Sequence, residues 1–188
     1  MRITGGSNKG RILSAVPKSA RIRPTSDKVR EAIFSILGQD LSGTNVLDLF
    51  SGTGSLGLEA LSRGAGSAVF IDHSHESIRL IRKNVELCGY GGSTGILKRD
   101  LRNGLPKELV NPEKHFDLVF FDPPYGFMGI PLVMESLSNG HCFSPGARAV
   151  VETSSRTTLP ARMGELKVVD TRAYGDTRIT LFMEKEAA

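Results

Sequence analysis

Residues 47–60, "LDLFSGTGSLGLEA", decide the fold because they join a strand to a helix through a glycine-rich turn. The apolar run at residues 45–50 predicts a buried strand, and residues 55–64 predict a helix. Gly52, Gly54 and Gly57 have the spacing G-x-G-x-x-G, in which each missing Cβ lets another group approach the backbone closely. Such a unit is typical of α/β proteins that bind a ligand at the carboxyl edge of a parallel sheet.

Strands and helices continue to alternate after this unit. Further strands are predicted at residues 67–72, 95–100, 116–122 and 147–153, and helices at 75–89 and near 131–140. This alternation predicts a mostly parallel sheet with helices on both faces. Two last strands, 166–174 and 177–185, flank the hairpin turn signal Gly175-Asp176. We therefore predict an α/β fold with a mostly parallel seven-stranded sheet and an antiparallel C-terminal hairpin.

The N-terminal segment differs from the rest of the chain in charge. The first thirty residues hold eight basic residues and one acidic residue, a net charge of +7, so the remainder carries −3 of the total +4. A basic arm on a mildly acidic body predicts a polyanionic partner such as nucleic acid, although a solvated basic surface is the alternative. We predict a β-hairpin and extended linker over residues 1–24, a helix from residue 25, and a main domain over 25–188.

Composition narrows the class of protein further. No apolar run approaches ~20 residues and the N-terminus lacks an apolar signal core, so we expect a cytoplasmic protein with no membrane span. Cys88 and Cys142 are far apart and suit a reduced compartment as small core residues. We expect no metal site, because His73 and His75 do not share a helix face and the other histidines lack neighbouring ligands.

An acidic residue near the end of the first strand indicates which charge the ligand carries. Asp48 precedes Gly52 by four residues, whereas in the dinucleotide fingerprint the glycine turn follows the strand directly. A carboxylate at this place would repel a diphosphate and suit a ligand with a cationic amino group. S-adenosylmethionine is such a ligand, since it carries an ammonium and a sulfonium and no phosphate.

Carboxylates also end the next two predicted strands. Asp72 could accept hydrogen bonds from both ribose hydroxyls, or it could cap the helix that follows. Asp100 could accept from an adenine amino group, or it could cap a loop. At the carboxyl edge of an open α/β sheet, all three carboxylates would face the crevice in which ligands bind.

The fourth parallel strand ends in "DPPY", residues 122–125. Two prolines fix φ and remove two amide donors, which leaves the Pro123 carbonyl as an acceptor beside the Asp122 carboxylate. Two acceptors suit an amino group with two hydrogens, and Tyr125 offers a face on which a flat base can stack. We interpret the motif as a clamp for an exocyclic amine; a simple strand-ending turn is the alternative.

These motifs resemble a known family. Asp122-Pro123-Pro124-Tyr125 is similar to the (D/N/S)PP(Y/F) motif of amino methyltransferases, and a parallel sheet with a C-terminal hairpin resembles, by analogy of fold, the Rossmann-like class I methyltransferases. "RPTSDKVREAIF" joined to "LDLFSGTGSLGLEALSRGA", with the "RITGGSNKGR" hairpin, resembles the bacterial RsmD family over nearly the whole chain. The resemblance implies methylation of guanine N2 in 16S ribosomal RNA by S-adenosylmethionine.

The resemblance also implies roles for individual residues. Asp122, Pro123, Pro124 and Tyr125 would be catalytic. The cofactor would contact the linker, the glycine loop and the ends of the second and third strands: Arg23, Thr25, Asp48, Phe50, Ser51, Gly52, Thr53, Gly54, Gly57, Asp72, His73, Asp100 and Leu101. RNA would bind the basic arm: Arg2, Lys9, Arg11, Lys18, Arg21, Arg23 and Arg30. His73 is a departure from the family's usual residues.

The expected protein is a monomeric enzyme that acts on 16S ribosomal RNA, within a particle of small-subunit assembly. Three other functions stay open at this point. DPPY would serve adenine N6 in DNA or RNA equally well. A non-catalytic RNA-binding assembly factor could keep the same fold, and a nicotinamide-dependent dehydrogenase would share the glycine spacing.

Overall fold

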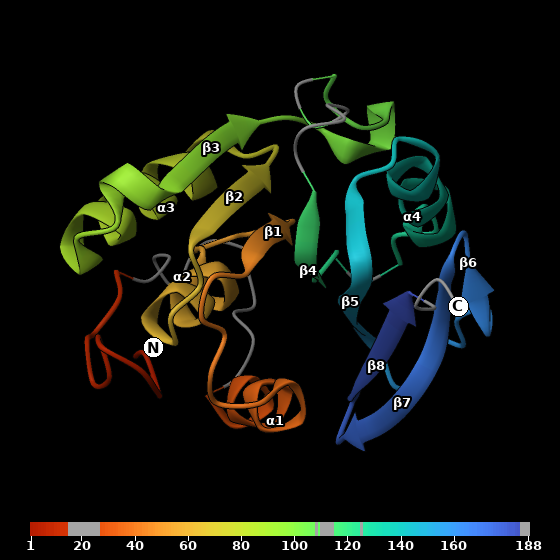
Figure 1. Ribbon diagram of the computed structural model, residues 1–188, viewed down its shortest axis with the longest axis horizontal. Coiled ribbons are helices and arrows are strands. Elements are labelled where there is room, and N and C mark those ends of the chain that lie inside the picture. Colours follow the sequence, from red (N-terminus) through yellow and green to blue (C-terminus); the bar gives the residue numbers. More distant parts are fainter. Residues whose placement is uncertain (15–26, 108, 110–114, 125, 185–188) are drawn as a thin grey trace. The chain divides into compact units, whose positions relative to one another are not determined.

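The computed structural model describes residues 1–14, 27–107, 109, 115–124 and 126–184 (Figure 1). The chain forms two compact units, Met1–Lys98 and Arg99–Ala188. Several residues with predicted roles lie outside the described part of the chain: Lys18, Arg21, Arg23, Thr25 and Tyr125.

The first unit contains a three-stranded parallel sheet in the order β3-β2-β1. Its strands are β1 (Asn45–Leu49), β2 (Ser67–Asp72) and β3 (Thr94–Lys98). Helices α2 (Ser55–Ser62) and α3 (His75–Cys88) pack against these strands and against each other. Every residue of α2 is buried, including the polar Ser55, Glu59 and Ser62. The α3 helix has a polar outer face and is capped at its start by Ser74, whose hydroxyl accepts from the amides of Glu76 and Ser77.

The N-terminus of the first unit is a short hairpin followed by α1 (Asp27–Leu37). In residues 1–14 the two predicted strands reduce to one antiparallel bridge between Arg2 and Ile12. Ile3 and Leu13 are buried, while the turn between them faces solvent. The hairpin was thus predicted correctly as a reversal of the chain, but its pairing is shorter than its sequence indicates.

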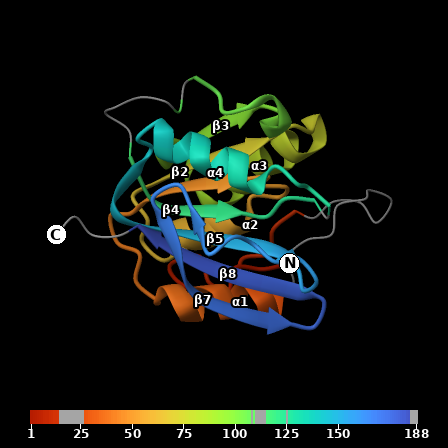
Figure 2. The ribbon, with the colours of Figure 1, turned by 90° about the vertical axis from the view of Figure 1, so that its right-hand side faces the viewer.

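The second unit has the strand order β4-β5-β8-β7-β6. Its strands are β4 (Phe116–Phe121), β5 (Phe143–Ser154), β6 (Arg162–Met163), β7 (Leu166–Tyr174) and β8 (Thr177–Glu184), and its helix is α4 (Ile130–Asn139). The β4 strand pairs with β5 in parallel, and β8 pairs antiparallel with both β5 and β7. Figure 2 shows the β7–β8 hairpin, whose turn lies at the predicted Gly175-Asp176.

The seven strands predicted after the N-terminal hairpin are all present, and the mixed α/β fold with an antiparallel C-terminal hairpin is confirmed. The two-residue strand β6 is additional, since two residues are too short to give a period of alternation. The third strand ends at Lys98, so Asp100 lies two residues beyond it. Within the described residues, no helix combines the length and apolar character that a membrane crossing needs.

The two cysteines are buried and free, one in each unit. Burial raises the pKa of the Cys88 thiol, against the opposing charge of Arg11, and burial also raises the pKa of the Cys142 thiol. Both are therefore small core residues, as predicted.

Candidate cofactor and substrate sites

The glycine loop after β1 has an unusual backbone that neighbouring elements hold in place. Phe50 has φ 58°, a left-handed value that is uncommon for a residue with a side chain. The Ser51 amide donates to the Ile71 carbonyl at 3.0 Å, and the Gly54 amide donates to the Ser51 carbonyl at 2.7 Å. Strained backbone of this kind clusters at ligand sites, where the surrounding structure keeps it in one conformation.

Asp48 supports the loop from within the protein. Its side chain is 1% exposed, and Oδ2 accepts from the amide of Gly57 at 3.0 Å, in the first turn of α2. A Cβ on Gly57 would lie 2.4 Å from the Phe70 ring and 3.2 Å from Asp48 Oδ2. Glycine at this position therefore allows the helix, the carboxylate and the aromatic ring to pack together. The role of this carboxylate toward a cationic ligand stays a prediction.

Asp72 links the end of β2 to the same loop. Its Oδ2 accepts from the Gly52 amide at 2.9 Å, and its Oδ1 accepts from the Ser74 amide at 2.8 Å. The alternative that Asp72 caps α3 is wrong, because Ser74 is the capping residue. The structure thus brings Asp48, Asp72 and the loop residues Gly52, Thr53 and Gly54 together in one unit.

The other predicted cofactor contacts follow the second and third strands. The side chain of His73 is 57% exposed, with Nδ1 3.6 Å from Asp72 Oδ1. Asp100 caps the short helix η2 (Leu101–Asn103) by accepting from the Arg102 amide at 3.0 Å, and its carboxylate pairs with the Arg102 guanidinium at 2.6 Å. This bond raises the pKa of Arg102. Asp100 is therefore a loop cap, and its contact with an adenine stays a prediction.

The DPPY motif begins where β4 ends. Phe116–Phe121 are largely buried, and Asp122 and Pro123 are half-buried at the end of the strand. The Pro124 carbonyl accepts from the Phe127 amide at 3.1 Å, which closes a turn around Gly126 at φ 82°. A glycine is needed there because the left-handed conformation disfavours a side chain. The strand therefore ends at the motif and the chain turns at Gly126, as predicted.

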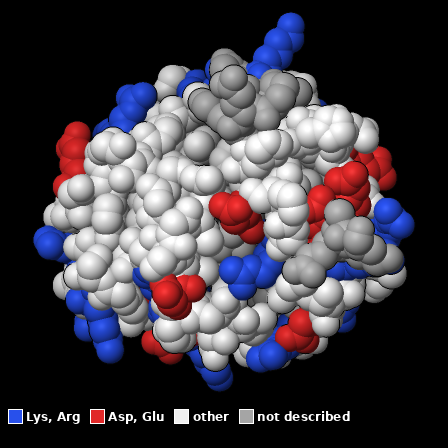
Figure 3. Space-filling view, in the orientation of Figure 1, with Lys and Arg blue, Asp and Glu red and all other residues white. Residues whose placement is uncertain are grey.

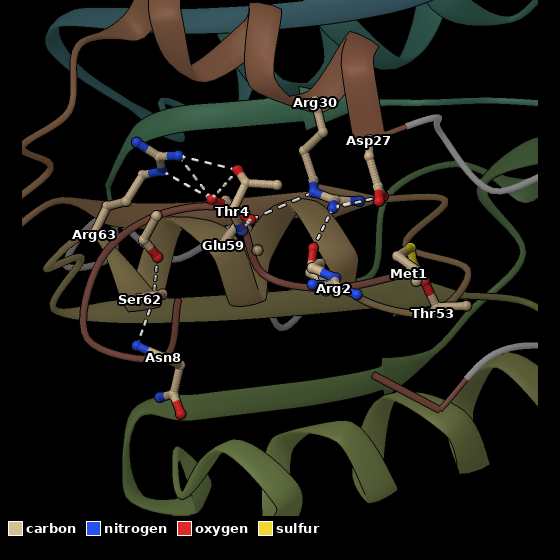
Figure 4. Close-up of polar contacts among 12 residues, drawn as sticks. Met1, Arg2, Thr4, Asn8, Asp27, Arg30, Thr53, Glu59, Ser62 and Arg63 are labelled. Atoms are coloured by element: carbon tan, nitrogen blue, oxygen red, sulfur yellow. Dashed lines mark hydrogen bonds and ion pairs between the residues drawn. The ribbon is translucent and has the colours of Figure 1, made fainter. Parts of the chain in front are cut away.

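A buried charge cluster ties the hairpin and α1 to α2 (Figure 4). Glu59 is fully buried and pairs with two arginines, Arg63 at 2.8 Å and Arg30 at 3.4 Å. Thr4 donates to the same carboxylate through its amide at 2.8 Å and its hydroxyl at 2.7 Å. Arg30 also bonds the Arg2 carbonyl and pairs with Asp27 at 2.9 Å. This cluster was not predicted, although a carboxylate in the middle of a largely apolar helix was a signal of it.

Some basic side chains of the N-terminal segment are exposed and others are buried. Arg2, Lys9 and Arg11 are exposed on the hairpin. Arg30 was predicted as an RNA contact, but its side chain is 0% exposed and faces Glu59, so a phosphate cannot reach it. On the face drawn in Figure 3, Lys and Arg are interspersed with acidic residues. We therefore leave Arg30 out of the candidate RNA surface.

Neither unit offers an evident metal centre in its described residues, where no three His, Cys, Asp or Glu side chains gather suitably. His75 instead lies 2.5 Å from the Lys98 ammonium, through Nε2. The polar groups around the glycine loop include backbone amides, carboxylates and the Ser51 hydroxyl, which suit an organic ligand.

The strand order, the C-terminal hairpin and the glycine loop define a Rossmann-like protein of the class I methyltransferase type. A family model described as "Conserved hypothetical protein 95" matches residues 1–183. Ribosomal RNA small subunit methyltransferase D of Haemophilus influenzae is 32% identical over 159 residues, covering 85% of this chain and 81% of the relative. The protein of the same name from Escherichia coli K12 is 32% identical, covering 85% and 78%. The chain belongs to this family, the RsmD family.

Solved structures agree with this assignment. The structure of yhhF from Escherichia coli has a TM-score of 0.84 and 25% identity, covering 100% of this chain and 99% of that chain. The structure of the Thermus thermophilus protein TTHA0928 has a TM-score of 0.77 and 29% identity, with the same coverage. The predicted fold class and family resemblance are both confirmed.

Proposed function

We propose that this protein transfers a methyl group from S-adenosylmethionine to the N2 amine of a guanine in 16S ribosomal RNA. Membership of the RsmD family carries the proposal, because relatives named small subunit rRNA methyltransferases align over 85% of the chain. The DPPY sequence is intact, which favours an enzyme over a non-catalytic assembly factor. The proposed substrate is available in the cytoplasm, during assembly of the small subunit.

The glycine loop is the proposed binding site for S-adenosylmethionine, which supplies the methyl group as a sulfonium. Residues 50–57 contain neither Lys nor Arg, and the carboxylates of Asp48 and Asp72 hold the loop. This negative environment suits a cationic ligand and opposes the diphosphate of a nicotinamide dinucleotide. Asp72 would bind the ribose, and Asp48 would act on the amino acid end through the loop that it supports.

The DPPY motif is the proposed site for the target base. The Asp122 carboxylate and the Pro123 carbonyl would accept the two hydrogens of the exocyclic amine, while Tyr125 stacks on the ring. Asp122 need not be a strong base, since the nitrogen becomes acidic only as it gains the methyl group. The guanine would leave its helix to reach this motif, at a cost of about a few kcal/mol.

Methyl transfer from labelled S-adenosylmethionine tests the proposed substrate. We expect label in rRNA from cells that lack this enzyme, and none in fully modified rRNA from wild-type cells or in duplex DNA. Label in duplex DNA would instead support the adenine alternative. Tight RNA binding without methyl transfer would support the assembly factor.

Replacing Asp72 with Ala should weaken binding of S-adenosylmethionine by about 1.5–3 kcal/mol for each charged hydrogen bond that is removed. The variant would lack the carboxylate that contacts the ribose, and the Gly52 amide would lose the acceptor that fixes the loop. Calorimetry on the folded variant measures this directly. The matched control is Asp176→Asn in the exposed β7–β8 turn, which should bind with wild-type affinity. Unchanged binding by Asp72→Ala would remove this residue from the cofactor site.

Exchanging Arg2, Lys9 and Arg11 for Gln should weaken RNA binding and reduce its dependence on salt. These side chains are exposed on the hairpin, so their replacement leaves its buried contacts in place. Removing one ionic interaction with a phosphate should lower the slope of log affinity against log salt by roughly 0.7–0.9. Filter binding over a salt series gives the slope. Exchange of the solvent-facing Arg162 in β6 is the control, and an equal slope in the triple variant and the wild type would contradict a role for the arm.

A further inference from the structure

Asn84 of α3 connects the N-terminal hairpin to the glycine loop. Its side chain is fully buried, and its Oδ1 accepts from the Ser14 amide at 2.8 Å. Its Nδ2 donates to the Ser14 carbonyl at 3.2 Å and to the Thr53 carbonyl at 3.0 Å. One amide side chain therefore binds two segments that lie 39 positions apart in the sequence.

Only an amide of this length satisfies the three bonds. Two carbonyls need donors and one backbone amide needs an acceptor, which fixes the direction in which the Asn84 amide points. An aspartate would lack the donors, and an apolar side chain would leave buried polar groups without a partner. Asn84 lies on the face of α3 that also buries Ile81, Val85 and Cys88, a place where a polar residue needs a specific reason.

The two segments that Asn84 joins belong to different proposed sites. Ser14 ends the described part of the basic hairpin, which exposes Arg2, Lys9 and Arg11. Thr53 is buried within the glycine loop, next to Gly52, whose amide bonds Asp72. Figure 4 shows a second approach of the same two segments, in which Thr53 Oγ1 lies 3.9 Å from the Met1 sulfur. A short chain of contacts therefore links the hairpin to the loop.

We propose that Asn84 is a positioning residue that couples RNA binding at the hairpin to cofactor binding at the glycine loop. The inference rests on the proposed function, which assigns RNA to the arm and S-adenosylmethionine to the loop. Bound RNA would hold the hairpin, and Asn84 would hold the loop in its binding conformation, so each ligand would raise the affinity for the other. Such a coupling is reciprocal, and each ligand typically changes the affinity for the other by a factor of about 5–150.

Calorimetry with S-adenosylhomocysteine, with and without a saturating 16S rRNA transcript, measures the coupling in the full-length protein. Wild-type protein should bind the ligand at least about fivefold more tightly when RNA is present. In Asn84→Ala the ratio of the two affinities should fall to near one. Ser14→Pro removes the donor to Oδ1 from the hairpin side and should give the same loss, which provides a second variant if Asn84→Ala fails to fold.

Asn8→Ala is the matched control. It deletes hairpin bonds to the Cys88 carbonyl at 3.2 Å and the Tyr90 hydroxyl at 2.7 Å, yet it leaves the Asn84 bridge intact. This variant should lose stability but keep the wild-type ratio. The inference would be overturned if folded Asn84→Ala or Ser14→Pro kept the wild-type ratio of affinities with and without RNA. It would also be overturned if wild-type protein bound both ligands with a ratio of one. In either case the proposed function would still stand. Wild-type protein that bound no RNA would overturn the proposed function and the inference with it.

Discussion

Replacing Asp122 with Asn is expected to lower kcat about 10²–10³-fold, the usual cost of removing one preorganised electrostatic partner from a transition state. The substitution keeps the shape of the side chain but removes its negative charge. Because the amine nitrogen gains positive charge as the methyl group arrives, the carboxylate acts mainly in the transition state. We therefore expect kcat and kcat/KM to fall together, with little change in the affinity for S-adenosylmethionine.

Single-turnover rates at saturating RNA separate this effect from weaker binding. Asp117→Asn is the control, because the same chemical change is made near the start of the same strand, and we expect its rate to stay close to that of the wild type. A near wild-type rate for Asp122→Asn would contradict the amine clamp. The two prolines would then be no more than a rigid turn after β4.

Glu59→Gln should lower the free energy of unfolding by about 3–5 kcal/mol, the usual result of breaking a buried ion pair by removing one partner. The variant would leave the guanidinium groups of Arg30 and Arg63 buried without the carboxylate that pairs with both. The loss should affect the hairpin first, because Thr4 donates two hydrogen bonds to the same carboxylate.

Urea unfolding followed by circular dichroism measures this loss by linear extrapolation. The control is Glu86→Gln on the exposed face of α3, which should change stability by no more than about 0.5 kcal/mol. If Glu59→Gln were as stable as this control, the cluster would be incidental to the packing of α1 and the hairpin.

The strands and helices were predictable because their apolar patterns are local. The N-terminal helix shows the limit of local patterns. Its apolar spacing predicts a buried stripe of Val29, Ile33, Ile36 and Leu37; Ile36 is only half-buried, and Arg30 is buried with the other three. Its partner Glu59 lies 29 residues away, and no periodicity links the two. Arg30 was therefore predicted to contact RNA, whereas in the structure it pairs with the buried carboxylate of Glu59.

The candidate cofactor site was predictable to a similar degree. The rule that ligands meet strand ends selected Asp48 and Asp72, and both lie at the glycine loop. Their hydrogen bonds to the loop amides, and the bridge made by Asn84, depend on contacts between distant segments that a sequence does not display. Asp100 was predicted at the end of a strand over 95–100, but that strand ends two residues earlier, at Lys98, and Asp100 caps the turn that follows.

Nucleoside mapping by mass spectrometry tests the central claim most directly. The substrate is 16S rRNA from cells that lack this enzyme, treated with the purified protein and S-adenosylmethionine, then digested to nucleosides and to sequenced fragments. We expect N2-methylguanosine at one position, and no product from the Asp122→Asn protein at the same reaction time. N6-methyladenosine, or no methylated nucleoside despite bound RNA and cofactor, would contradict the claim.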